Sequence, residues 1–147
     1  MSVFPVCWEM YTTLLTAEDL LLRTQFETQT LPDGGFRHRE HVRLTWIYLT
    51  EAPPADVAAR LCRELRAVAT GHGKPERFHH TLTVAWVRII EAARRERQDA
   101  PFDVLADACP YLLDKDTPLA FYTPDRLFSD DARQGWIEPN RKPLPAV

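Results

Sequence analysis

Apolar residues recur along this chain at intervals of three and four, the spacing that places them on one face of an α-helix. The pattern predicts four substantial helices, separated by segments rich in proline and glycine. No segment alternates apolar and polar residues for long enough to predict a strand. The predicted helices cover residues 16–29, 37–51, 54–71 and 78–97.

Residue types at the predicted helix ends support these limits. Thr16 is followed by Ala17-Glu18-Asp19, which is typical of an N-cap with acidic residues in the first turn. The segment Leu31-Pro32-Asp33-Gly34-Gly35 is a strong turn signal. The segment from Gly71 to Pro75 ends the third predicted helix, because glycine readily takes the left-handed conformation of a C-cap.

The two ends of the chain carry weaker patterns. Residues 1–15 predict an irregular arm or a short first helix, and residues 136–147 predict an extended tail. Between residues 102 and 135, prolines interrupt short apolar pieces, and Ser129 is suited to cap one more short turn. We therefore expect a single domain over the whole chain. Its fold class is all-α, a helical bundle of about four main helices with a proline-punctuated C-terminal segment.

Composition narrows the class of protein. The chain has 147 residues, of which 45% are hydrophobic and 27% charged, with a net charge of −3, so it fits one globular domain with no electrostatic reason to bind nucleic acid. No segment approaches the roughly 20 apolar residues of a membrane span, and no signal peptide is evident. Cys7, Cys62 and Cys109 lack metal-binding spacing and favour free thiols in a reducing compartment. We expect a cytoplasmic protein without a membrane partner.

Four of the five histidines fall in two clusters, and each cluster opens a predicted helix. The first is Phe36-Arg37-His38-Arg39-Glu40-His41, and the second is Phe78-His79-His80-Thr81. At about 100° per residue, His38 and His41 lie on the apolar face of their helix. His79 lies on the apolar face of the later helix, whereas His80 lies at its margin. Because burying an imidazole without a partner costs free energy, these positions are candidates for a functional site.

A metal centre is the leading hypothesis for these histidines. A His-x-x-His pair on a helix separates the two Cβ atoms by about 5–6 Å, so both rings can reach one ion. A third imidazole would complete a set of three ligands, which is common in catalytic zinc sites. We predict His38, His41 and His79 as ligands of a divalent transition metal. Zinc, iron, copper and nickel are not distinguished by imidazole ligands alone. The prediction requires that the starts of the two helices meet.

Two alternatives to a metal centre stay open. The protein could be a metal-free binding module for a small organic molecule, with a pocket lined by imidazoles and tryptophans. It could also be a structural or protein-interaction domain, in which His38 caps a helix, His79 is a satisfied core residue and the proline-rich tail docks on a partner or a second subunit.

Other side chains could support chemistry at the same place. His80 or Tyr122 could act as acid-base groups or orient metal ligands, although a turn explains the surroundings of Tyr122 equally well. Trp46 and Trp86 could wall a pocket near the histidines or pack in the core. An open position on a bound metal could activate water or dioxygen, so the sequence leaves open whether the protein is an enzyme.

The two histidine segments resemble a family of small, uncharacterised bacterial proteins. The family pattern is F-x-H-x-x-H with a downstream tryptophan, followed by an aromatic-His-x-Thr motif. Here His38, His41 and His79 match the pattern, and His80 falls at its variable position. The segment from Tyr122 to Arg133 is also similar to such chains. The resemblance covers most of residues 34–140 and implies no reaction, since none is attached to the family.

Overall fold

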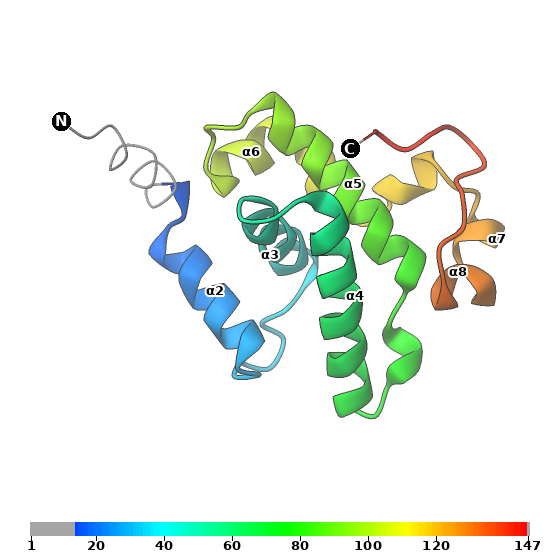
Figure 1. Ribbon diagram of the computed structural model, residues 1–147, viewed down its shortest axis with the longest axis horizontal. Coiled ribbons are helices and arrows are strands. Elements are labelled where there is room, and N and C mark those ends of the chain that lie inside the picture. Colours follow the sequence, from blue (N-terminus) through cyan, green and yellow to red (C-terminus); the bar gives the residue numbers. More distant parts are fainter. Residues whose placement is uncertain (1–13, 147) are drawn as a thin grey trace.

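The computed structural model describes residues 14–146, in which every regular element is helical (Figure 1). This confirms the predicted all-α fold class. Four of the longer helices match the four predicted ones, with ends that differ by two residues at most. The longer helices are α2 (Ala17–Glu27), α3 (His38–Leu49), α4 (Pro54–Gly71), α5 (His80–Glu96) and α6 (Phe102–Ala108).

Shorter elements connect or follow these helices, as the prolines predicted. A proline occupies the first or second position of four of them, where its fixed φ suits a helical turn and its missing N–H is not needed. Ser129 caps the last one through a 3.2 Å bond from the backbone N–H of Ala132. They are η1 (Pro75–Arg77), η2 (Pro110–Leu113), η3 (Thr117–Ala120), α7 (Pro124–Leu127) and α8 (Asp130–Gln134).

Helix α3 lies at the centre of the molecule. After its first turn, nearly every side chain from Val42 to Leu49 is buried, including those of Trp46 and Tyr48. A helix that is apolar on all sides must be surrounded by other elements. Helix α3 accordingly packs against α2, α4, α5 and η2.

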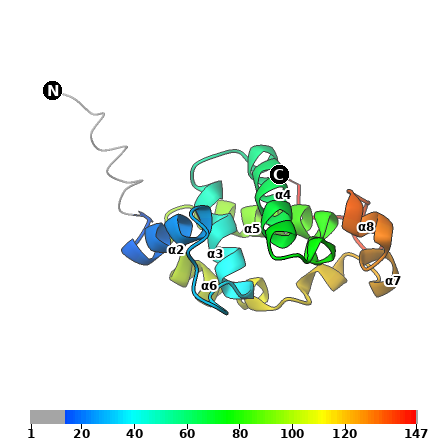
Figure 2. The same cartoon turned by 90° about the horizontal axis from the view of Figure 1, so that it is seen from below.

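Helix α5 forms the second main support of the fold. It packs against α3 and α4 and receives the C-terminal segment on its other side. Both Figure 1 and Figure 2 show α7 and α8 at the end of the molecule opposite α2. The hydroxyl of Thr81, in the first turn of α5, donates to the carbonyl of Gly135 at 2.6 Å and accepts from the N–H of Ile137 at 3.2 Å.

The predicted terminal segments have different outcomes. Residues 135–146 contain no helix and run along the chain's own core, where Leu144 is buried and the carbonyl of Pro145 accepts a 3.1 Å bond from Arg88. Docking of this tail on a partner stays a prediction. Residues 1–13 of the predicted N-terminal arm lie outside the described residues, whereas Leu14 and Leu15 pack half-buried against the core.

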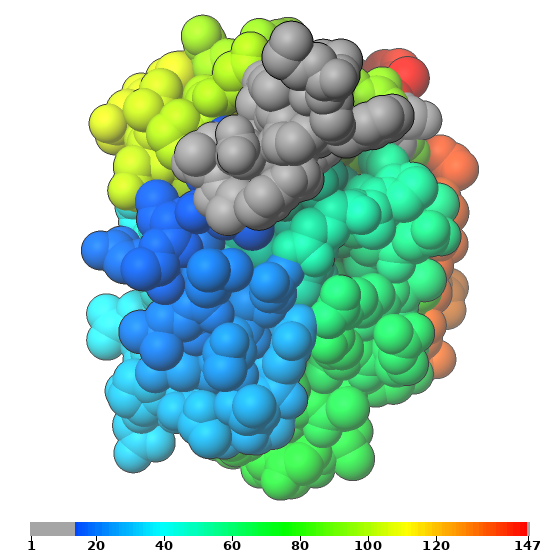
Figure 3. Space-filling view, turned by 60° about the vertical axis from the view of Figure 1, so that its left-hand side comes forward, coloured from blue at the N-terminus to red at the C-terminus, as the bar shows by residue number. Residues whose placement is uncertain are grey.

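Helices α2 and α4 meet along a seam on one face of the molecule (Figure 3). An ion pair crosses this seam, with the Arg60 guanidinium 2.6 Å from the Glu27 carboxylate. The same guanidinium lies 3.9 Å from the centre of the Tyr48 ring, and the Tyr48 hydroxyl donates to Glu27 at 3.1 Å. The seam is therefore closed by a charged and aromatic network.

A buried ion pair joins the start of α2 to α3. The Asp19 side chain is fully buried and accepts a 2.5 Å bond from Nε of Arg43. Its other oxygen accepts the N–H of Thr16 at 2.8 Å, and the Thr16 hydroxyl accepts the N–H of Asp19 at 3.2 Å. These reciprocal bonds form a capping box and confirm the predicted N-cap.

Replacing Asp19 by alanine should destabilise the protein strongly. Asp19→Ala removes the cap and leaves the Arg43 guanidinium largely buried without its partner, so we expect a loss of about 3 kcal/mol. Glu18→Ala is the matched control, because Glu18 is exposed and lies 3.5 Å from the same guanidinium. It should cost less than about 0.5 kcal/mol. Urea unfolding followed by circular dichroism measures both values, and equal losses would contradict the expectation.

Candidate functional site

A pocket of about 420 Å³ opens between the start of α3, the end of α4 and the first turns of α5. Its walls are mainly apolar and aromatic, and a few polar side chains enter it. Pockets of this size and character are typical of small-molecule sites. The apolar lining comes mainly from Phe36, Val42, Leu65, Val68, Phe78, Leu82, Trp86 and Ile90.

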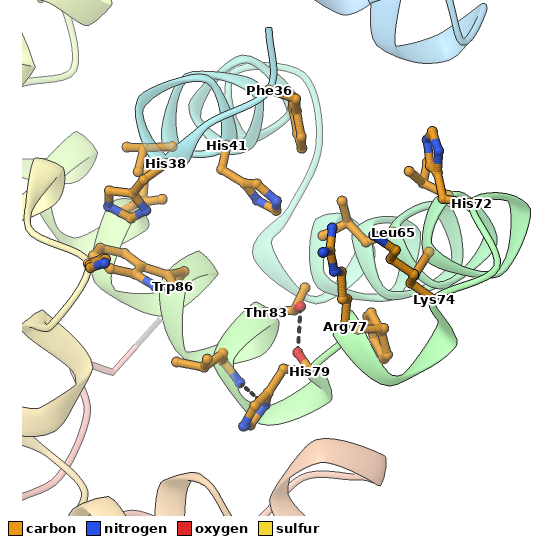
Figure 4. A pocket seen from close by; sticks show the side chains of 17 residues that line it. Phe36, His38, His41, Leu65, His72, Lys74, Arg77, His79, Thr83 and Trp86 are labelled. Carbon is orange, nitrogen blue, oxygen red and sulfur yellow. Dashed lines mark hydrogen bonds between the residues drawn. The ribbon is translucent and has the colours of Figure 1, made fainter. Parts of the chain in front are cut away.

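Both predicted histidine clusters contribute to this pocket. His38 and His41 reach it from the first turn of α3, and His79 reaches it from the residue before α5 (Figure 4). Phe36 and Phe78, which open the two clusters in the sequence, also line it. The helix starts therefore share one cavity, as the three-histidine hypothesis required. Shared lining does not by itself bring the rings to one point.

The His79 side chain caps α5. Its Nδ1 accepts the N–H of Leu82 at 3.1 Å, and its Nε2–H donates to the carbonyl of Leu127 at 2.7 Å. The ring is thus neutral, and both nitrogens are engaged. Burial is the main cause that lowers the pKa of His79 below its usual value. The ring connects the start of α5 to α7, a structural role.

The His38 ring is half-buried at the first residue of α3. Its Nε2 lies 2.9 Å from the carbonyl oxygen of Leu112 in η2, and because a carbonyl only accepts, Nε2–H is the donor. The ring also packs on the indole of Trp86, with centroids 4.8 Å apart. One nitrogen of His38 thus anchors η2 to α3, and the other has no hydrogen bond to the described residues.

The His41 ring is the one most clearly directed into the pocket (Figure 4). Neither ring nitrogen has a hydrogen-bond partner among residues 14–146, and the ring lies 4.4 Å from that of Phe36. Burial, with a smaller contribution from His38, lowers the pKa of His41 to about 4. At neutral pH His41 therefore offers a neutral donor and acceptor to whatever occupies the pocket.

The structure does not assemble the predicted three-histidine metal site. His38 and His79 point one nitrogen each at separate carbonyls, and His79 uses its second nitrogen as a cap. Within residues 14–146, no group of three or more histidine, cysteine, aspartate or glutamate side chains is placed to hold one ion. Metal binding through His38 and His41 stays a prediction.

The predicted acid-base residues lie outside the pocket lining. His80 begins α5, its ring is edge-on to Phe78 at 6.3 Å, and burial lowers its pKa. Tyr122 is fully buried and donates to the carbonyl of Ile137 at 2.7 Å, and burial raises its pKa to about 12. Tyr122 thus holds the C-terminal segment. A catalytic role for either residue stays a prediction.

The two candidate tryptophans have different positions. Trp86 lines the pocket and packs on His38, as expected for a pocket wall. Trp46 is 1% exposed and packs on Phe102, with centroids 5.8 Å apart. The prediction that Trp46 also walls the pocket is therefore corrected, because its position in α3 directs it toward α6 and the core.

The basic side chains of the pocket carry no signal in the sequence that would predict their place there. Lys74 and Arg77 line it from the connection between α4 and α5, and Lys115 lines it from the loop between η2 and η3. His72, at the end of α4, joins them. In the sequence, the segment around Lys74 carries only a helix-stop signal. Loop residues from distant parts of the chain share no periodic pattern that would predict a common site.

Comparisons with known proteins assign no family to this chain. It matches no family model, and it matches no curated protein and no solved structure. Within residues 14–146, no helix combines the length and the apolar character needed to cross a bilayer. Any function must therefore be inferred from the pocket itself.

The low pKa of His41 predicts that acid destabilises the fold. The unfolded ring titrates near 6.5 and the folded ring near 4, so the unfolded state binds the proton first. The stabilisation is complete above pH 6.5, falls as the pH drops from 6.5 toward 4, and levels off below 4. The difference in pKa corresponds to at most about 3 kcal/mol.

Nuclear magnetic resonance titration of the His41 ring, together with urea unfolding at several pH values, measures this effect. In a His41→Gln variant the free energy of unfolding should depend less on pH over the same interval. The remaining dependence should come partly from His79, whose pKa is lowered in the same direction. An identical loss of stability in both proteins would show that His41 is not the group responsible.

Proposed function

We propose that this protein binds a small, largely apolar organic molecule in the pocket between α3, α4 and α5. The observation that carries the proposal is the cavity of about 420 Å³, with mainly apolar walls and the His41 imidazole directed into it without a hydrogen bond to the described residues. Large apolar pockets with few convergent polar groups are the usual form of a small-molecule site. This function is the metal-free binding module considered from the sequence.

The pocket walls favour a ligand with a flat apolar body. Phe36, Phe78 and Trp86 present aromatic rings, which interact with other rings by offset or edge-to-face packing. A neutral His41 can donate one hydrogen bond and accept another. Its half-buried ring would fix the orientation of the ligand, because an unpaired polar atom on the ligand or on His41 would weaken binding.

The lining supports binding better than catalysis. Among residues 14–146, no aspartate, glutamate, serine or cysteine lines the pocket. The single hydroxyl, that of Thr83, donates to the carbonyl of His79 at 2.7 Å. A pKa of about 4 makes His41 a weak base at neutral pH. The described lining thus offers a ligand surface without an activated nucleophile or a well-matched general base.

Filling the pocket should abolish binding without unfolding the protein. Ala69 is half-buried on α4 and lines the pocket, so an Ala69→Phe side chain should occupy ligand space. Ala67→Phe is the matched control, because Ala67 is exposed on the same helix and outside the lining. The probe is 2-(1-naphthyl)ethanol, a neutral bicyclic alcohol, measured by isothermal titration calorimetry.

We expect the original protein and Ala67→Phe to bind this probe with a Kd on the order of 10–100 µM. Ala69→Phe should weaken binding at least about tenfold while its melting temperature stays close to that of the control. Equal affinities for all three proteins would place the probe elsewhere on the surface and contradict the proposal.

A transition-metal ion held by His38 and His41 is the second candidate function. The observation that favours it is the bond from His38 Nε2–H to the Leu112 carbonyl, since metal-binding histidines commonly donate their other ring N–H to a carbonyl. The neutral state of His41 also suits metal binding. Two imidazoles make an incomplete set, so this candidate ranks below the apolar ligand.

Calorimetric titration of protein without a histidine tag tests the metal candidate with ZnCl₂ and NiCl₂. If the metal site exists, one equivalent binds, and His41→Ala loses that binding because one of two ligands is gone. His80→Ala is the control, because His80 is half-buried close to the pocket but outside its lining. Absence of saturable binding would reject the metal candidate and leave the small-molecule proposal standing.

A further inference from the structure

The charged residues of the pocket all have one sign. Lys74, Arg77 and Lys115 line it, and no aspartate or glutamate among residues 14–146 does. All three are exposed, so their charged groups lie where the cavity meets solvent and not among its apolar walls. The chain as a whole carries a net charge of −3. The positive rim is therefore a local feature and does not follow from overall composition.

Most other basic side chains form an ion pair or a hydrogen bond with the described residues, whereas the three cations at the rim of the pocket do not. Their side chains form no ion pair and no hydrogen bond with residues 14–146. Six other arginines are paired with carboxylates, whereas exposed Arg63 and Arg66 resemble the rim cations in having no ion pair with the described residues. The paired ones are Arg23, Arg39, Arg43, Arg60, Arg94 and Arg95.

The backbone that carries two of these cations is held in place. The N–H of Lys74 donates to the carbonyl of Ala69 at 2.9 Å, which ties it to the end of α4. The carbonyl of Glu76, just before Arg77, accepts a 2.7 Å bond from Arg133 in α8. Lys74 and Arg77 therefore reach the rim from a fixed turn, which reduces the entropy lost when they bind a ligand.

The inner part of the pocket is unfavourable for a cation. His41 stays neutral there, because burial and the nearby His38 oppose a positive charge. Glu76, Asp114 and Asp116 flank the rim cations in the sequence, yet none of them lines the cavity. A positively charged ligand would thus meet three like charges at the mouth and no carboxylate inside.

We propose that the natural ligand of the pocket is an amphipathic anion, with an aromatic or other apolar body and one terminal negative group. The body packs against the aromatic walls, and Lys74 and Arg77 hold the anionic group at the mouth, with Lys115 adding to the field. Arg77 contributes most, because guanidinium binds carboxylate through two parallel hydrogen bonds. This inference rests on the proposed small-molecule function and adds the charge of the ligand.

Three probes with the same bicyclic body and different charge test the inference. They are 1-naphthaleneacetate, the neutral 2-(1-naphthyl)ethanol and the cationic 2-(1-naphthyl)ethylamine, each titrated into the intact 147-residue chain by calorimetry at pH 7.5. We expect the acetate to bind at least about tenfold more tightly than the alcohol, and the amine to bind most weakly. Raising NaCl from 20 to 300 mM should weaken binding of the acetate and leave the alcohol unchanged.

Variants locate the anionic group. Arg77→Gln should lower acetate affinity about tenfold and Lys74→Gln about threefold, while alcohol affinity changes by less than twofold. Arg63→Gln is the matched control, because Arg63 is exposed on α4, has no ion pair with the described residues and does not line the pocket. Melting temperatures close to that of the original protein exclude unfolding as the cause.

The outcomes separate this inference from the function on which it rests. Tighter binding of the acetate that Arg77→Gln abolishes and Arg63→Gln preserves supports the anionic ligand. Equal binding of acetate and alcohol, or preference for the amine, overturns the anionic ligand and leaves the apolar pocket standing. Failure of all three probes to bind overturns the small-molecule function itself.

Discussion

The burial of α3 on all sides is the constraint on which the rest of this structure depends. From Val42 to Leu49 its side chains are apolar or hydrogen-bonded in almost every direction, so α2, α4, α5 and η2 must all pack around it. Only its first turn escapes this enclosure. That turn carries His38 and His41, and both side chains line the pocket between α3, α4 and α5.

Two of the histidine rings that line the pocket form hydrogen bonds with distant parts of the chain. His79 binds the start of α5 to Leu127 in α7, and His38 binds the start of α3 to Leu112 in η2. His38 thus uses one ring nitrogen, and His79 uses both, in hydrogen bonds that hold the fold together. His41 is the ring left facing the cavity, so one histidine of the expected three remains most available for a ligand.

Much of the fold was accessible from local signals. The three-four spacing of apolar residues, the cap at Thr16 and the glycine and proline breaks predicted the four main helices to within two residues at each end. Helical phase also placed His38, His41 and His79 on inward faces, and all three line the pocket. Phase could not predict that Trp46 would turn toward Phe102, since direction around a buried helix depends on which neighbour fills each side.

The sequence by itself therefore determined the helices and the faces they bury, because periodicity, capping and chain breaking act over a few residues. Only the tertiary structure decided what the histidines do. Their partners, the carbonyls of Leu112 and Leu127, lie 74 and 48 residues away and carry no side-chain signature. The same holds for the basic rim, since Lys74 and Lys115 meet one cavity only after η1 and the loop after η2 have been placed by packing.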